Sequence, residues 1–84
     1  MRFMTLLKSL PGKYTEAIRQ FKHPKVPDEV KVIQFLATFG EWDCIVLFEA
    51  QSEEIAARFI VQFGEVANST TLVCFPVEQL HWTR

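Results

Sequence analysis

The stretch FGEWDCIVLFEAQSEE, residues 39–54, contains a glycine turn, an apolar strand and the start of a helix. Gly40 separates two long runs, EVKVIQFLATF at 29–39 and WDCIVLFEA at 42–50, that are rich in β-branched and aromatic side chains. Two such runs divided by a glycine turn are typical of a β-hairpin. Ser52 follows the second run at a position where its hydroxyl can cap a helix. The stretch therefore predicts a hairpin that leads directly into a helix.

Two segments of the chain have the apolar spacing of an amphipathic helix. The first begins at Pro11, repeats apolar side chains at positions 14, 17, 18 and 21, and ends before Pro24. A proline fits the first turn of a helix, but it disfavours helical geometry at the residue before it. The second segment follows the Ser52 cap, carries two glutamates in its first turn and ends at Gly64. Each segment predicts a helix with one buried face.

Two further apolar segments, RFMTLLK at 2–8 and TTLVCFPV at 70–77, predict the first and last strands. The polar residues at 65–69 predict a loop before the last strand. The order strand, helix, strand, strand, helix, strand is the ferredoxin-like βαββαβ pattern of the α+β class. We therefore expect a single domain at residues 1–78, with a four-stranded antiparallel sheet of order 4-1-3-2, and a C-terminal tail at 79–84.

The two cysteines, Cys44 and Cys74, belong to the third and fourth strands of this arrangement, which flank the first strand. Strands two positions apart are separated by about 9 to 10 Å, which is beyond the reach of a disulfide. We therefore expect both side chains to remain reduced thiols.

Polar and apolar residues do not alternate in the predicted strands. Hydrophobic residues make up 49% of the chain, and CIVLF at 44–48 contains no polar residue. Because a sheet with one face in water alternates polar and apolar positions, both faces are expected to be buried. Two helices can cover one face, and a second subunit is the simplest cover for the other. Burying roughly 700 to 900 Å² of apolar surface per subunit would contribute on the order of 20 kcal/mol to association before entropy costs. We therefore expect an obligate homodimer. Its two sheets would pack face to face in a dimeric α/β barrel.

The tail VEQLHWTR at 77–84 carries Leu80 and Trp82, which are exposed unless they dock on another surface. We expect the tail to pack on the partner subunit or to join dimers into a larger assembly. A higher oligomer is therefore an open alternative to the dimer.

Charge and composition exclude several classes of partner. Nine Lys and Arg against ten Asp and Glu give a net charge of -1, so no positive field exists to bind nucleic acid or an anionic membrane. No apolar run reaches the roughly 18 residues that span a bilayer, and a Pro-Gly break interrupts the first apolar segment, so a cytoplasmic protein is expected. No phosphate-binding loop, CxxC pair or metal-ligand spacing is present in the sequence. We therefore expect no metal, no cofactor, no nucleic acid and no membrane partner.

Trp42 and Asp43 follow the glycine turn and are the first candidate site residues. Asp43 could be a ligand anchor or a general base at the mouth of a pocket, with a pKa raised by desolvation. The alternative, which we favour, is a turn carboxylate that accepts backbone N–H groups. Trp42 either lines a ligand site or packs in the core or the subunit interface.

Gln34 and Thr38 are polar residues inside an otherwise apolar strand. Their even spacing predicts that they share one face with Val30, Val32 and Leu36. Because buried polar groups need hydrogen-bond partners, these two side chains either anchor a ligand or bond across the subunit interface.

Tyr14 and His23 complete the set of candidates. Tyr14 begins the first helix and is either a ligand contact or a half-buried core residue. His23 lies in the proline-rich loop and is a candidate proton shuttle, although neither it nor His81 has a second catalytic group at a recognisable spacing. A surface histidine is the alternative interpretation for both.

The segment Gly40–Asp43, the strand CIVLFEA, the helix start QSEE and a last strand that ends in FP together resemble the GYD domain family. That family is named for a Gly, Tyr, Asp motif, and Trp42 stands here in place of the tyrosine. The opening MRFMTLLKSLPGKYTEAI is similar to small domains of unknown function in the same dimeric α/β-barrel superfamily. The resemblance implies a ferredoxin-like subunit that pairs sheet to sheet, and it implies no particular activity.

Two functional hypotheses follow. The first is a homodimeric binding, structural or regulatory module that accepts a small apolar or amphipathic ligand between sheet and helices. The second is a cofactor-free enzyme, similar to the monooxygenases or isomerases of the superfamily, that acts on an aromatic or quinol substrate in the same cavity. In the second hypothesis Asp43 or His23 would be the base, and Trp42 or Tyr14 would position the ring.

Overall fold

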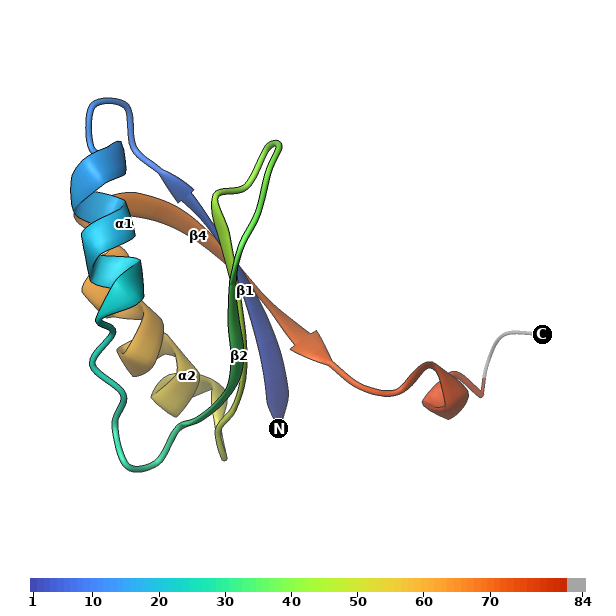
Figure 1. Cartoon of the computed structure of the whole chain (residues 1–84). Coiled ribbons are helices and arrows are strands. Elements are labelled where there is room, and N and C mark those ends of the chain that lie inside the picture. Colours follow the sequence, from blue (N-terminus) through green and yellow to red (C-terminus); the bar gives the residue numbers. More distant parts are fainter. Residues whose placement is uncertain (82–84) are drawn as a thin grey trace.

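A computed structural model describes residues 1–81 and contains one four-stranded antiparallel sheet with two helices on one of its faces (Figure 1). This arrangement is the α+β, ferredoxin-like fold predicted from the sequence. Among the described residues, no helix is long and apolar enough to cross a membrane. The elements in chain order are β1 (Arg2–Ser9), α1 (Tyr14–Lys22), β2 (Lys31–Ala37), β3 (Cys44–Glu49), α2 (Glu53–Ile60), the 3₁₀ turn η1 (Val61–Phe63), β4 (Ala67–Cys74) and the 3₁₀ turn η2 (Val77–Gln79).

The strands lie in the order β2-β3-β1-β4, which is the predicted order. The first strand, β1, pairs antiparallel with β3 on one side and with β4 on the other. Leu7 of β1 lies opposite Cys44, whereas Arg2 lies opposite Cys74. The two cysteines therefore lie on different sides of β1 and at opposite ends of it, and both are free thiols.

Several predicted boundaries differ from the structure by a few residues; the second helix, predicted to end at Gly64, ends at Ile60 and is followed by η1. Three further differences concern the last strand and the first helix. The last strand begins at Ala67 instead of residue 70, because the long β1 pairs with it as far as Ser9 opposite Ala67. Residues 67–69 are thus strand and not loop; Ala67 is buried in the core, and the exposed polar Asn68 and Ser69 suit an edge strand. The same strand ends at Cys74, before Pro76. The first helix begins at Tyr14 and not at Pro11, because Gly12 adopts a positive φ of 78° in a turn before it.

The core lies between the sheet and the two helices. Ser52 caps α2 as predicted, since its hydroxyl accepts a hydrogen bond from the Ile55 N–H at 3.2 Å. Phe59 of α2 packs edge-on against Phe48 of β3, with ring centroids 5.0 Å apart. Thr5, the one buried polar residue of the described chain, shares a hydrogen bond of 2.8 Å with the Thr71 hydroxyl. The largest fully buried side chains are Phe3, Phe48, Phe59, Phe63, Leu7, Val46 and Thr5.

The other face of the sheet has no helix over it in the described chain (Figure 1). Successive side chains of a strand point to opposite faces, so the neighbours of the buried β1 residues point away from the helices. The register brings apolar side chains of all four strands together there. Leu36 and Leu72 are each 46% exposed. We call this surface the open face; its apolar residues are Met4, Leu6, Leu36, Ile45, Leu47 and Leu72.

A β-bulge in β2 overturns the prediction that Gln34 shares a face with Val30 and Val32. Val32 lies opposite Phe48, and Gln34 lies opposite the next residue of β3, Leu47, so the intervening residue of β2 is extra. The bulge shifts the alternation by one position. Val32 therefore packs against the core, whereas Gln34 lies on the open face and is exposed.

Residues 75–81 follow β4 and form what we call the C-terminal arm. The arm leaves the sheet on the side opposite the helices and extends away from the rest of the chain (Figure 1). It contains the short turn η2 and two exposed apolar side chains, Phe75 and Val77. Leu80 is half-buried, and Trp82, which was expected to be exposed unless docked, lies outside the described residues.

Candidate functional site

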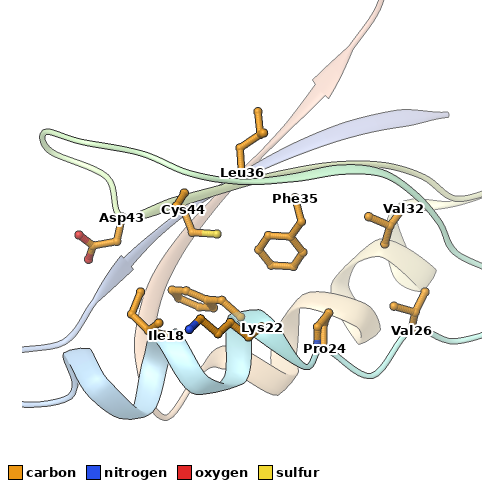
Figure 2. A pocket seen from close by; sticks show the side chains of 11 residues that line it. Ile18, Lys22, Pro24, Val26, Val32, Phe35, Leu36, Asp43 and Cys44 are labelled. Carbon is orange, nitrogen blue, oxygen red and sulfur yellow. The ribbon is translucent and has the colours of Figure 1, made fainter.

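An open pocket of about 420 Å³ lies between α1 and the β2–β3 end of the sheet (Figure 2). Its walls come from α1, from the loop after α1, from β2, and from Asp43 and Cys44 at the start of β3. The pocket is lined mostly by carbon. The lining residues are Ile18, Phe21, Lys22, Pro24, Val26, Val32, Phe35, Leu36, Ala37, Asp43 and Cys44.

The sequence of the helix end explains why a pocket forms here. Pro24 disfavours helical geometry at His23, so α1 ends at Lys22 and the chain turns toward β2. The loop then places Pro24 and Val26 at one end of the pocket (Figure 2). Because β2 is an edge strand, no further strand of the described residues closes the pocket beyond it.

Phe35 forms an inner wall of the pocket. Figure 2 shows its ring extending from β2 toward α1. The ring is 6.3 Å from that of Phe21 and 6.2 Å from that of Phe63, measured between centroids. These aromatic contacts fix the ring, so the wall is rigid and apolar.

Lys22 is the cationic side chain of the pocket. It lies one helical turn after Ile18, so both side chains are on the pocket side of α1. Figure 2 shows its chain lying along the helix, with the nitrogen directed toward the end of the pocket where Ile18 lies. Within residues 1–81, the two ion pairs are Arg2 with Glu49 and Lys13 with Glu16, so Lys22 has no anionic partner there. Its ammonium group is therefore available to a ligand.

Asp43 lies at the edge of the pocket, but its carboxylate already accepts hydrogen bonds from Ser9. One oxygen, Oδ2, accepts hydrogen bonds from the Ser9 N–H at 2.8 Å and from the Ser9 hydroxyl at 2.7 Å. The backbone N–H of Asp43 donates to the Leu7 carbonyl at 2.9 Å. The two bonds from Ser9 lower the pKa of Asp43. The ionised side chain thus links the hairpin to the end of β1 through hydrogen bonds.

Cys44 contributes a neutral thiol to the pocket wall. Figure 2 shows its sulfur pointing toward the Phe35 ring. The residue is only 4% exposed, and burial raises the pKa of its thiol to about 11. Because the thiolate is the nucleophilic form, this thiol behaves as a small apolar group at neutral pH.

The chain matches the model of the family described as Domain of unknown function (DUF3303) over residues 1–81. This protein belongs to the DUF3303 family. A search of the curated proteins finds no match to the chain. The family description gives no activity, so the function of this DUF3303 domain has to be argued from its own residues.

The structure brings three of the predicted site residues of the DUF3303 domain together in the hairpin. The Thr38 hydroxyl donates to the Trp42 carbonyl at 2.5 Å, and the Thr38 N–H donates to the Asp43 carbonyl at 3.1 Å. Both hydrogen bonds join the two sides of the hairpin beyond the last paired residues of β2 and β3. Of the three residues, Asp43 alone lines the pocket. Thr38 and Trp42 therefore hold the hairpin that presents Asp43.

The other predicted residues lie elsewhere. Tyr14 is 59% exposed at the start of α1, in a shallow hollow on the helix surface. Gln34 lies on the open face, where it is opposite Leu47. His23 follows the last residue of α1, and its N–H donates to the Gln20 carbonyl at 3.2 Å. None of these three lines the pocket of Figure 2, so the structure does not assemble the predicted set at one place.

Sequence reasoning missed Lys22, Phe35 and Cys44 as pocket residues. A helical projection could have identified Lys22, because it follows Ile18 by four positions and precedes the Pro24 break. Phe35 could not have been assigned in this way, since the bulge before Gln34 sets the face on which it lies.

A second groove, of about 450 Å³, lies between α2 and β4. Its lining includes the hydroxyls of Ser69 and Thr71 and one charged side chain, Glu53. The Thr71 hydroxyl is hydrogen-bonded to the Thr5 hydroxyl. The wall of this groove is more polar than the wall of the first pocket. Among residues 1–81, no three His, Cys, Asp or Glu side chains are grouped so that they could hold a metal ion.

Proposed function

We propose that this DUF3303 domain is a homodimeric module that binds a small amphipathic organic anion in the pocket between α1 and the β2–β3 edge. The observation that carries the proposal is an apolar pocket of about 420 Å³ that is lined by Lys22, whose ammonium group has no ion-pair partner within residues 1–81. Ligand sites are commonly clefts of about 300 to 1,000 Å³ with apolar walls and a few polar groups that orient the ligand. Both properties are present here.

The sign of the ligand charge follows from the side chains around the pocket. Lys22 is the one cationic side chain among the lining residues and Asp43 is the one acidic side chain, whereas Arg19 and Lys25 lie in other hollows of the surface. The Asp43 carboxylate lies at the same end of the pocket as Ile18 (Figure 2), and it already accepts two hydrogen bonds, which reduces its capacity to bind a cationic ligand. An anionic head beside Lys22, with an apolar body against Phe35 and Val32, is therefore the arrangement that the pocket favours.

The open face supports the dimer in the proposal. Its six apolar residues form a contiguous patch on all four strands, and such patches commonly mark protein interfaces. Two open faces packed together would bury Met4, Leu6, Ile45 and Leu47, which the subunit leaves half-buried. This arrangement is also the one that the resemblance to the GYD family and the dimeric α/β-barrel superfamily implies.

The pocket gives less support to a cofactor-free enzyme. Such an enzyme needs a general base with a pKa near the working pH. Hydrogen bonds from Ser9 lower the pKa of Asp43, which makes its carboxylate a weak base. His23, the other candidate base, is not among the lining residues. Binding is therefore the function that this geometry favours.

A fluorescence titration with 8-anilinonaphthalene-1-sulfonate tests the binding site, because this probe joins aromatic rings to a sulfonate. We expect saturable binding to the unmodified protein. Lys22→Ala should weaken binding about fivefold, which corresponds to ~1 kcal/mol for a partly exposed ion pair. The matched control Arg58→Ala removes an exposed cation from α2, away from the pocket, and should leave the affinity unchanged.

A second variant locates the probe. Val26→Trp adds bulk at the loop end of the pocket, where Val26 is 43% exposed and its replacement need not disturb the core. We expect this variant to lose most of the binding. Equal affinity in Val26→Trp and in the unmodified protein would show that the probe binds elsewhere, and no saturable binding at all would contradict the proposed site.

A further inference from the structure

Two large apolar side chains of the C-terminal arm are exposed to water. Phe75 and Val77 are 50% and 77% exposed. The Gln79 N–H donates to the Pro76 carbonyl at 2.9 Å and the His81 N–H donates to the Gln79 carbonyl at 3.0 Å, so both bonds end within the arm. The arm is thus a locally ordered segment that holds two large apolar groups away from the sheet.

The dimensions of the subunit show how far the arm extends. The radius of gyration is 13.7 Å, whereas a compact domain of this length has a radius of about 12 Å. The principal extents are 44, 31 and 18 Å. Figure 1 shows that the arm extends on the side of the sheet away from the helices, which is the side of the open face. In a dimer joined at the open faces, this is the side occupied by the second subunit.

The area of the open face is small for a dimer. Four strands about 4.8 Å apart, with six to eight paired residues of about 3.4 Å each, give a face of about 400 to 500 Å². A stable interface usually buries about 800 Å² per partner. The arm supplies further apolar surface next to the open face, which brings the contact closer to this size.

We propose that each arm packs on the partner subunit, so that the two arms extend the dimer interface. The inference rests on the proposed dimer and adds a named segment to its interface. Phe75 and Val77 are the residues that enter the contact, because they are the exposed apolar side chains of the arm. Residues 1–74 remain a complete βαββαβ unit, since β4 ends at Cys74.

Photo-crosslinking distinguishes the partner from the parent chain. The photoreactive p-benzoylphenylalanine replaces Val77 in the full chain, and unlabelled and ¹⁵N-labelled protein are mixed in urea and refolded together. We expect crosslinks that join a light chain to a heavy chain. The control carries the same group at Val61, which is similarly exposed at 72% but lies at the end of α2 on the helix side of the sheet. It should give few such pairs.

Truncation gives a second, independent readout. A chain that ends at Cys74 should fold but dissociate more readily, with a dimer dissociation constant raised by about 30-fold, the effect typical of losing one interface hot spot. Crosslinks confined to one chain, or a truncated chain that dimerises as tightly as the full chain, would overturn the arm contact while leaving the dimer intact. A full chain that is monomeric would refute the dimer and the arm contact together.

Discussion

Asp43 connects two segments that are distant in the sequence. Its carboxylate binds both the backbone N–H and the hydroxyl of Ser9, at the end of β1. Its own N–H binds the Leu7 carbonyl, so the ladder between β1 and the hairpin closes at this residue. The position of the aspartate after the glycine turn suggested either a site or a structural role, and the bonds to Ser9 favour the structural one.

Asp43→Asn should therefore reduce stability more than it reduces binding. We expect the free energy of unfolding, measured with urea, to fall by about 1 to 2 kcal/mol, because two hydrogen bonds to a charged acceptor are weakened. Ser9→Ala removes one of the two bonds and should cost about half as much. An Asp43→Asn protein of unchanged stability that no longer binds the naphthalene sulfonate probe would instead identify Asp43 as a ligand anchor.

The lowered pKa of Asp43 also predicts a dependence on pH. Its folded-state pKa lies below the ordinary value of 3.8 because of the bonds from Ser9. A carboxyl whose pKa is depressed on folding stabilises the protein above the unfolded-state value, and this contribution is lost as the pH falls through the folded-state value. The difference in unfolding free energy between the unmodified protein and Asp43→Asn should thus be constant above about pH 5 and shrink below about pH 4.

Urea denaturation at several pH values between 7 and 3 measures this difference. Glu41→Gln, which alters an exposed acid of the same hairpin, is the control and should follow the unmodified protein. If the difference in unfolding free energy between the unmodified protein and Asp43→Asn stays constant down to pH 3, the carboxylate charge does not have the stabilising role described above.

At the scale of elements, helical apolar spacing predicted the two helices, and apolar runs rich in β-branched and aromatic residues predicted the four strands. The deviations have local causes. Residues 67–69 are strand, although Asn68 and Ser69 are polar, because β1 extends to Ser9 and offers them partners. The bulge before Gln34 has no marker in the sequence, since neither glycine nor proline lies near it. Both features belong to the pairing between strands, and the pattern of a single segment contains no information about that pairing.

Ser52 provides a test at the same scale. Its hydroxyl accepts from the Ile55 N–H in the first turn of α2, which is one of the turn's N–H groups without an intrahelical partner. Ser52→Ala should lower the free energy of unfolding by about 1 kcal/mol. The control Thr15→Ala changes an exposed hydroxyl in α1 and should have a smaller effect, as should Ser52→Asp, which retains a capping oxygen. Equal stability of Ser52→Ala and the unmodified protein would show that the cap contributes nothing.

At the scale of the whole molecule, the missing alternation in CIVLF predicted an apolar surface outside the core, and the structure has one in the open face. The pocket was less predictable. Its walls combine the end of α1, a proline loop and an edge strand with a bulge, so its shape depends on how these parts meet. Of the predicted ligand contacts, Asp43 alone lies there, because the others were chosen for being polar rather than for their position on a wall.

The dimer is tested by a single charge at the centre of the open face. Leu47 lies between Met4 of β1 and Gln34 of β2 and is not part of the buried core. Leu47→Glu would place a carboxylate in an apolar interface at a large desolvation cost while leaving the subunit fold intact. Val61→Glu, on the helix side, is the matched control.

Sedimentation velocity of the three proteins at about 10 µM separates the outcomes. We expect a dimer for the unmodified protein and for Val61→Glu, and a folded monomer for Leu47→Glu. An unmodified protein that sediments as a monomer, or a Leu47→Glu protein that remains dimeric, would contradict the pairing of open faces.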